Sequence, residues 1–275
     1  MTIALGLWFS LAIGVSDYHG GYLARRTRAV STVATAFVAG MVTMAVLMLV
    51  VDSEFLGADV GLGTGSGMLV GFALAAMYRG ISESSAAVVA PLTITLSVVI
   101  PFGWDLSNGG SLTRLAGVGA VVAFVGLGLT TFSPELGDKV RPGLVWGLIA
   151  GLCFGTAMTL LGQTSEASGL WPALVQRIVG FGALAVTALG RGFPILVPPN
   201  WRPRAALSGA AGATGVAAFT VGAQQGSLAE IAATTALAPV VTALLATRFE
   251  GDPMRWWQML GAVVCAGGVA MIGAG

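Results

Sequence analysis

Apolar stretches long enough to cross a lipid bilayer follow one another from end to end of the sequence. A transmembrane helix needs about 20 predominantly apolar residues. Ten stretches come near this length, at 3–23, 32–51, 63–79, 85–104, 113–132, 143–162, 171–190, 205–222, 228–247 and 256–274. Only 9% of the residues are charged, whereas a soluble domain carries about 25%. The sequence therefore predicts an all-α integral membrane protein with ten transmembrane helices, a multi-pass protein of the cell (inner or plasma) membrane.

The composition argues against several classes of function. The net charge is +1, so the chain has no strong field to attract nucleic acid. The two cysteines, Cys153 and Cys265, both lie in apolar stretches, and the single histidine does not suit a zinc site. We expect no nucleic-acid partner, no cofactor and no metal site. The first stretch follows Met1 without a basic segment, so we expect it to remain as a span.

The two halves of the sequence repeat one pattern. The fourth and ninth stretches each carry an Ala-Pro pair, at Pro91 and Pro239, and each is followed by a glycine-rich stretch. The third and eighth stretches are both comparatively short. Because each half has an odd number of helices, the halves must enter the membrane in opposite directions. Inverted repeats with broken or short helices at matching positions are typical of secondary transporters. We therefore expect two inverted five-helix repeats, at 1–133 and 142–275.

The charges of the connecting loops predict the orientation. The connections on the even-numbered side carry Arg114 as their one basic residue. The odd-numbered connections carry all the others that lie between spans: Arg25, Arg26, Arg28, Arg79, Lys139, Arg141, Arg191, Arg202, Arg204, Arg248 and Arg255. The positive-inside rule places the odd connections in the cytoplasm. Both termini are then expected outside.

The end of the second half resembles the EamA family of the drug/metabolite transporter superfamily. The stretch GSLAEIAATTALAPVVTALLATRFEGDPMRWWQMLGAVVCAGGVAMIG has the family's small residues, proline break, helix-ending Glu250, Trp257–Gln258 pair and closing glycine-rich helix. The first half resembles the family more weakly, because PFGWDLSNGG replaces the glutamate after its fourth helix. The resemblance implies ten helices, no ATP-binding domain and secondary movement of small metabolites, usually export. Some members are thought to have cytoplasmic termini, whereas the loop charges here predict the reverse.

The two prolines and their neighbours are the first candidate site. A proline inside a helix frees the carbonyl four residues before it, and freed carbonyls with nearby hydroxyls can line a polar cavity at the bilayer midplane. The residues concerned are Pro91, Thr93, Thr95, Pro239, Thr235 and Thr242. The alternative is a kink needed only for packing, with the threonines bonding back to their own helices.

Asp17 and His19 form the second candidate. Asp17 is the one carboxylate placed inside an apolar stretch, and such residues are costly and usually functional. It suits proton coupling or the binding of a substrate amine. The alternative is that the span ends at Ser16, which would leave both groups at the interface. Trp8, in the same stretch, is the tryptophan expected to face a cavity.

Arg177, with Gln176 beside it, lies about two turns into the seventh stretch. An arginine in this place could bind a substrate carboxylate or phosphate. It could also extend its charged group to the near interface while its stem stays in the membrane. We favour this second reading.

Two glycine-rich patterns have structural explanations. Gly143, Gly147, Gly151 and Gly155 are four residues apart, which places them on one helix face and permits close approach of another helix. GLGTGSG lacks the lysine of a phosphate-binding loop. We expect it to be a flexible extracytoplasmic lead into the third helix.

These features together favour a secondary transporter, and not an enzyme, that moves a small organic metabolite by alternating access. An amino-acid-like or moderately hydrophobic molecule suits the polar residues best, and export is the expected direction. The first, third, fourth, sixth, eighth and ninth helices are expected to line the cavity. The partners would be the substrate, the lipid bilayer and a coupling proton, and a homodimer is left open. The alternatives are a membrane scaffold or lipid-binding protein and, less favoured, an intramembrane enzyme.

Overall fold

The computed structural model describes residues 2–107, 113–131, 137, 140–225, 238–250 and 255–273. The α-helices in these ranges are α1 (Thr2–Ala24), α2 (Ala29–Leu47), α3 (Gly57–Glu83), α4 (Ala86–Ser107), α5 (Arg114–Thr131), α6 (Val140–Gly162), α7 (Trp171–Gly190), α8 (Arg202–Gln225), α10 (Ala238–Glu250) and α11 (Trp256–Gly273). Two short 3₁₀ helices, η2 (Glu166–Ser168) and η3 (Pro199–Trp201), precede α7 and α8. The described part of the chain contains no strand, so the all-α prediction is confirmed for it.

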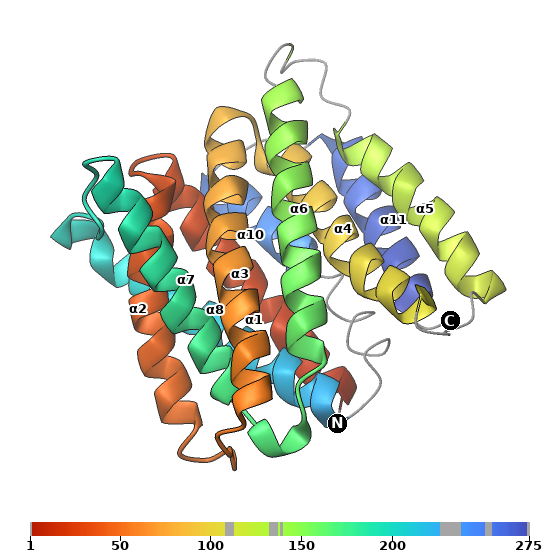
Figure 1. Ribbon diagram of the computed structural model, residues 1–275. Helices are drawn as coiled ribbons and strands as arrows, with labels where there is room; N and C mark the ends of the chain where they lie inside the picture. The colour runs from red at the N-terminus through yellow and green to blue at the C-terminus, as the bar shows by residue number, and fades with distance from the viewer. Residues whose placement is uncertain are drawn as a thin grey trace.

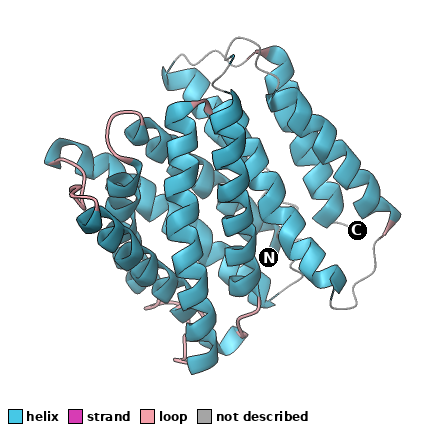
Figure 2. Ribbon diagram, turned by 45° about the horizontal axis from the view of Figure 1, so that its top comes forward, coloured by secondary structure: helices cyan, strands magenta, loops and turns pink. Residues whose placement is uncertain are grey.

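Helices of the first half pack mainly against helices of the second half. α1 contacts α8, α2 contacts α7 and α8, and α3 lies between α6 and α7. α4 packs on α6, and α5 pairs with α11 at one side of the bundle (Figure 1). The same arrangement is seen from a second direction in Figure 2. Buried side chains of α1, α2, α3, α4, α6, α7 and α8 form one large apolar cluster, so the two halves of the chain share this core.

Five of the described helical segments are long and apolar enough to cross a membrane by length and composition: Ala29–Leu47, Gly57–Glu83, Val140–Gly162, Trp171–Gly190 and Pro199–Gln225. Large apolar side chains on their outer surfaces are exposed, for example Val42 and Val186. Lipid tails can cover such side chains. The chain is therefore a multi-pass membrane protein.

The glycine row of α6 is a packing face, and its partner is α4 of the same chain. A Cβ built on Gly147 would lie 3.1 Å from Leu92, and one on Gly151 would lie 2.7 Å from the Cβ of Leu96. Small residues on such a face let two helix backbones approach closely. The prediction of a close-packing face is confirmed, and the partner helix that the sequence left open is internal.

The third and eighth helices are not short, contrary to the expectation. α3 has 27 residues and α8 has 24. GLGTGSG is part of α3 and is not a flexible lead, because two of its glycines, Gly63 and Gly67, pack against α7. A Cβ on Gly67 would lie 2.5 Å from the backbone oxygen of Gln176. The glycines of this stretch disfavour a helix by themselves, and the close packing stabilises the helical conformation.

Pro91 lies inside α4, as predicted. Pro239 is the second residue of the described helix α10, which covers Ala238–Glu250. The residues that precede Ala238, Thr235 among them, lie outside the described residues, so a proline break within the ninth span stays a prediction.

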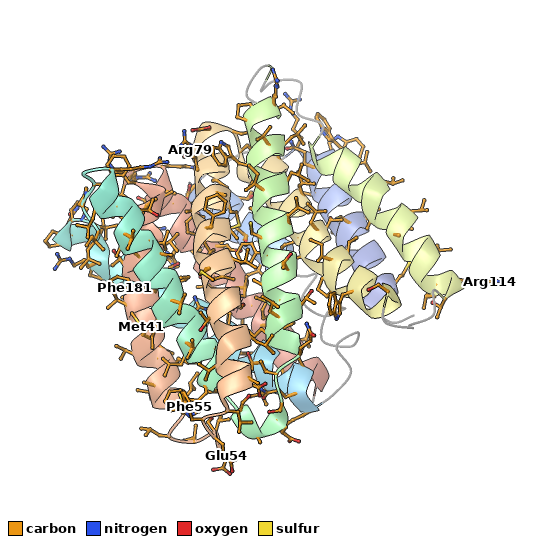
Figure 3. The ribbon with its side chains drawn as sticks, viewed as in Figure 1. Met41, Glu54, Phe55, Arg79, Arg114 and Phe181 are labelled. Carbon is orange, nitrogen blue, oxygen red and sulfur yellow. The ribbon has the colours of Figure 1, made fainter. Side chains whose placement is uncertain are left out.

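The two ends of the bundle carry different charges. Figure 3 shows Arg79 at one end, where α3 finishes, and Glu54 at the opposite end, between α2 and α3. The connections between α1 and α2, between α3 and α4, and between α7 and α8 lie at the Arg79 end. We call this the basic end.

Candidate functional site

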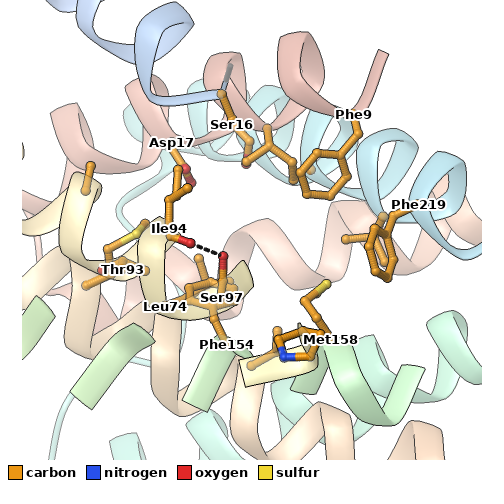
Figure 4. Close-up of a pocket in the computed structure, with 18 of the residues that line it drawn as sticks. Phe9, Ser16, Asp17, Leu74, Thr93, Ile94, Ser97, Phe154, Met158 and Phe219 are labelled. Atoms are coloured by element: carbon orange, nitrogen blue, oxygen red, sulfur yellow. Dashed lines mark hydrogen bonds between the residues drawn. The ribbon is translucent and has the colours of Figure 1, made fainter. Parts of the chain in front are cut away.

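A cavity of about 110 Å³ lies inside the bundle, between α1, α3, α4, α6, α7, α8 and α10 (Figure 4). It has room for several water molecules. Six of these helices are the ones that the sequence predicted to line a cavity, since α10 corresponds to the ninth stretch, and α7 is an addition. The wall is largely apolar and includes Phe9, Phe154, Met158 and Phe219.

Five polar side chains line the same cavity: Ser16, Asp17, Thr93, Ser97 and Arg177. Three of them, Asp17, Thr93 and Arg177, are sequence-predicted candidates that lie on α1, α4 and α7. In Figure 4, Asp17 and Thr93 lie across the cavity from Phe219. The fold therefore gathers one carboxylate, one guanidinium and a threonine hydroxyl in an otherwise apolar space.

Asp17 lies inside α1, about two turns before the helix ends at Ala24. The nearby Arg25 is paired instead with Glu250, at 3.0 Å, and Arg26 stacks on the ring of Tyr22, 3.6 Å from its centre. Among the described residues, no hydrogen bond or ion pair to Asp17 is formed. The helix continues past Ser16 to Ala24, and the carboxylate of Asp17 is available to a molecule in the cavity.

Arg177 is buried, with 4% of its surface exposed. Its Nη2 donates a hydrogen bond to the carbonyl oxygen of Gly212 at 2.9 Å, and its Cζ lies 5.1 Å from the centre of the Phe37 ring. The Nε has no hydrogen-bond partner in the part of the chain that the structure describes. The prediction that the Arg177 side chain extends to the membrane interface is therefore wrong. α2, α3 and α8 pack around this part of α7 and hold the guanidinium inside the bundle.

Tyr78 lies near both Asp17 and Arg177. It was not predicted from the sequence. This side chain of α3 is buried and contacts Gly20, and the electrostatic neighbours of its hydroxyl include both Asp17 and Arg177. Ser16 and Ser208 lie beside the hydroxyl, and Ser208 Oγ donates to the carbonyl oxygen of Ser16 at 2.8 Å. A polar path therefore runs from α1 through α3 and α8 toward α7. The glycine opposite the tyrosine was the available signal, but its partner is far away in sequence.

Three other predicted residues lie away from the cavity. The Nε of Arg204 donates to Nδ1 of His19 at 3.0 Å, near the basic end. Gln176 Nε2 donates to Ser66 Oγ at 2.8 Å, which ties α7 to α3. Trp8 is 51% exposed and does not line the cavity, so its expected role there is not supported.

The candidate threonines that the structure describes differ in which reading of the sequence they support. Thr93 Oγ1 bonds back to the carbonyl oxygen of Val89 at 2.9 Å while the side chain also lines the cavity. Thr242 Oγ1 bonds back to Ala238 and reaches Gly14 on α1, at 3.1 and 3.2 Å. Thr95 does neither.

Thr95 Oγ1 lies 3.2 Å from Cys265 Sγ and joins α4 to α11. This contact takes its hydroxyl away from the cavity. Pro91 belongs to the helical backbone of α4, and Pro239 belongs to that of α10.

A network of polar and aromatic side chains joins α1, α8 and α10 at the basic end. Its members are His19, Tyr22, Arg25, Arg204 and Glu250, and we call it the Tyr22 network. The guanidinium of Arg204 lies 3.3 Å from the centre of the Tyr22 ring, and the Arg25–Glu250 pair links α1 to the end of α10. This network holds the three helices together on one side of the cavity.

Comparison with known proteins gives a family and a fold. Residues 141–274 match the model of the EamA-like transporter family. No curated protein matches the sequence. A solved structure titled "Crystal structure of protein" is similar over 98% of this chain and 95% of that chain, with a TM-score of 0.69 and 15% identity. At this identity the likeness concerns the fold alone.

Proposed function

The chain belongs to the EamA-like transporter family through its second half, residues 141–274, and from this we propose that it is a secondary transporter that exports a small organic metabolite. The family is one of drug/metabolite transporters. The observation that best supports the proposal is the internal cavity in which Asp17 and Arg177 are the charged side chains. Ionisable residues inside a membrane bundle commonly mark substrate or proton pathways.

Alternating access between two inverted five-helix repeats is the mechanism that suits this arrangement. Two features support it: the interleaved packing of the two halves around the cavity, and the place of Ala90 and Ala238, the residues that precede the two prolines, in the cavity wall. Transporters of this type bind substrate where helices are interrupted near the midplane. In such a cycle the Tyr22 network would open and close the basic end.

Asp17 is the residue proposed to couple transport to a proton. A carboxylate in an apolar cavity is more stable when protonated or paired, and Asp17 has no pair among the described side chains. Proton binding on one side of the membrane and release on the other would give the two open states different affinities for substrate, which net transport requires. Binding of a substrate amine is the alternative role for the same group.

The proposal is tested by comparing metabolites inside and outside cells that express or lack the protein. Export predicts that a few compounds move outward on expression and accumulate inside on deletion. The absence of a reproducible shift under several growth conditions would contradict export of a metabolite. A shift in the inward direction would keep transport and overturn the direction alone.

A further inference from the structure

The guanidinium of Arg177 is only partly used by the protein. Nη2 is bonded to the carbonyl oxygen of Gly212, whereas Nε is buried without a partner in the described part of the chain. A buried donor without a partner costs free energy, and the cost is greater for a charged group. The residue lines the cavity, and Nε itself is enclosed by protein, so a molecule in the cavity would meet the guanidinium at its terminal nitrogens.

The protein holds the guanidinium in place before any ligand arrives. The carbonyl oxygen of Gly212 accepts from one terminal nitrogen, and the ring of Phe37 lies on one side of the guanidinium. A fixed, planar guanidinium recognises a carboxylate better than a mobile ammonium does, because it can donate two parallel hydrogen bonds. The orientation of the guanidinium is thus fixed by the protein itself.

Gly212 leaves room beside this group. A Cβ at position 212 would lie 2.8 Å from Ser16 Oγ and 3.9 Å from Arg177 Nη2. The missing side chain therefore lets the Ser16 hydroxyl approach the backbone of α8 beside the guanidinium. All three residues line the cavity.

The remainder of the cavity wall determines which kind of molecular body, polar or apolar, the ligand can have. Apart from the five polar side chains, it consists mainly of apolar and aromatic groups, among them Phe9, Phe154 and Phe219. An apolar wall favours an apolar or aromatic body through burial of its surface. A single charged group with a bulky hydrophobic body fits these surroundings better than a polyanion does.

We propose that the substrate carries a carboxylate bound by Arg177 beside Ser16 and Gly212, with an apolar or aromatic body against the phenylalanine side of the cavity. The proposal rests on the transport function given above and narrows its substrate class. Carboxylates with and without an α-ammonium share this chemistry. Asp17, which lines the same cavity, is the group that would distinguish them, because it can pair with an ammonium.

Binding to the purified full-length protein tests the carboxylate. The probes are L-phenylalanine, 3-phenylpropionate and the amides of both, and the measured quantity is the dissociation constant. Each carboxylate is expected to bind about tenfold or more tightly than its amide, the effect of a charge-assisted bidentate pair. Equal binding of acid and amide, or no binding of any probe, would overturn the proposal without requiring any variant.

Variants then locate the preference. R177Q is expected to remove the difference between acid and amide, and R177K to retain part of it. R191Q, at the exposed end of the same helix, is expected to behave as the unaltered protein. A preference for acids that persists in folded R177Q would overturn the assignment to Arg177. If R177Q does not fold, R177K takes its place, and an unchanged acid-to-amide ratio in R177K would overturn it instead.

Two further comparisons separate the remaining outcomes. In D17N, weaker binding of L-phenylalanine with unchanged binding of 3-phenylpropionate would identify the substrate as a zwitterion, whereas equal effects on both would identify a simple carboxylate. Metabolite export by cells together with absent carboxylate preference would overturn this inference and leave the proposed function standing. Absent export with absent binding would overturn both.

Discussion

Asp17 on α1 and Arg177 on α7 line the same cavity, although they lie in different halves of the chain. Tyr78 of α3 has both as electrostatic neighbours. The two charges therefore belong to one polar region inside an otherwise apolar bundle.

Replacing Asp17 by asparagine is expected to remove the dependence of transport on pH. The amide keeps the shape of the side chain but cannot bind or release a proton. Transport would be measured in proteoliposomes across a range of imposed pH gradients, with E54Q, at an exposed position outside the cavity, as the control. A D17N variant that follows the pH gradient as the unaltered protein does would exclude proton coupling through this residue.

Adding a side chain at Gly151 is expected to destabilise the α4–α6 interface. The Cβ alone would come 2.7 Å from Leu96, and overpacking of this kind typically costs about 1–3 kcal/mol. G151V should therefore lower the temperature of thermal unfolding of the detergent-purified protein. G182V is the matched control, because a Cβ at position 182 meets nothing within 4 Å. Equal stability of the two variants would contradict the close approach of α4 and α6.

The Arg25–Glu250 pair is expected to contribute modestly to the joining of α1 and α10. The two side chains lie 3.0 Å apart and are partly exposed, so a coupling of up to about 1 kcal/mol is expected in a double-mutant cycle. The cycle uses R25Q, E250Q and the double variant, with unfolding free energy as the readout. The exchanged pair, R25E with E250R, should restore part of the loss. A coupling of zero would show that this contact does not hold the Tyr22 network together.

The basic end is expected to face the cytoplasm. In a chain without its two native cysteines, E54C should react with a membrane-impermeant thiol reagent added to intact cells. R191C should react only after the membrane is permeabilised. Both positions are exposed and lie in connections at opposite ends. The reverse labelling pattern would show that the termini are cytoplasmic.

Much of the fold could be predicted from the sequence, because hydrophobic stretches record membrane spans directly. The glycine row of α6 likewise predicted a packing face, which the contacts with Leu92 and Leu96 confirm. The length of α3 could not be predicted in this way. Its glycines resemble a loop signal, and only the backbone of α7 packed against Gly67 explains why the segment is helical.

The site was harder to predict, because burial depends on neighbours that are distant in sequence. Arg177 has the same local sequence whether it extends to an interface or remains inside, and the packing of α2, α3 and α8 on α7 decides which. Tyr78 was missed for the same reason, since its contact with Gly20 joins α3 to α1. Asp17 was identified because a lone carboxylate in an apolar stretch is informative by itself.

We propose that the cavity containing Asp17 and Arg177 is the transport site. It is tested most directly by comparing secreted metabolites from cells that express the unaltered protein, the D17N/R177Q double variant at equal membrane abundance, or neither. If this cavity is the transport site, a few compounds are expected to move outward with the unaltered protein and to remain inside with the double variant. Equal export of the same compounds by both forms would contradict it.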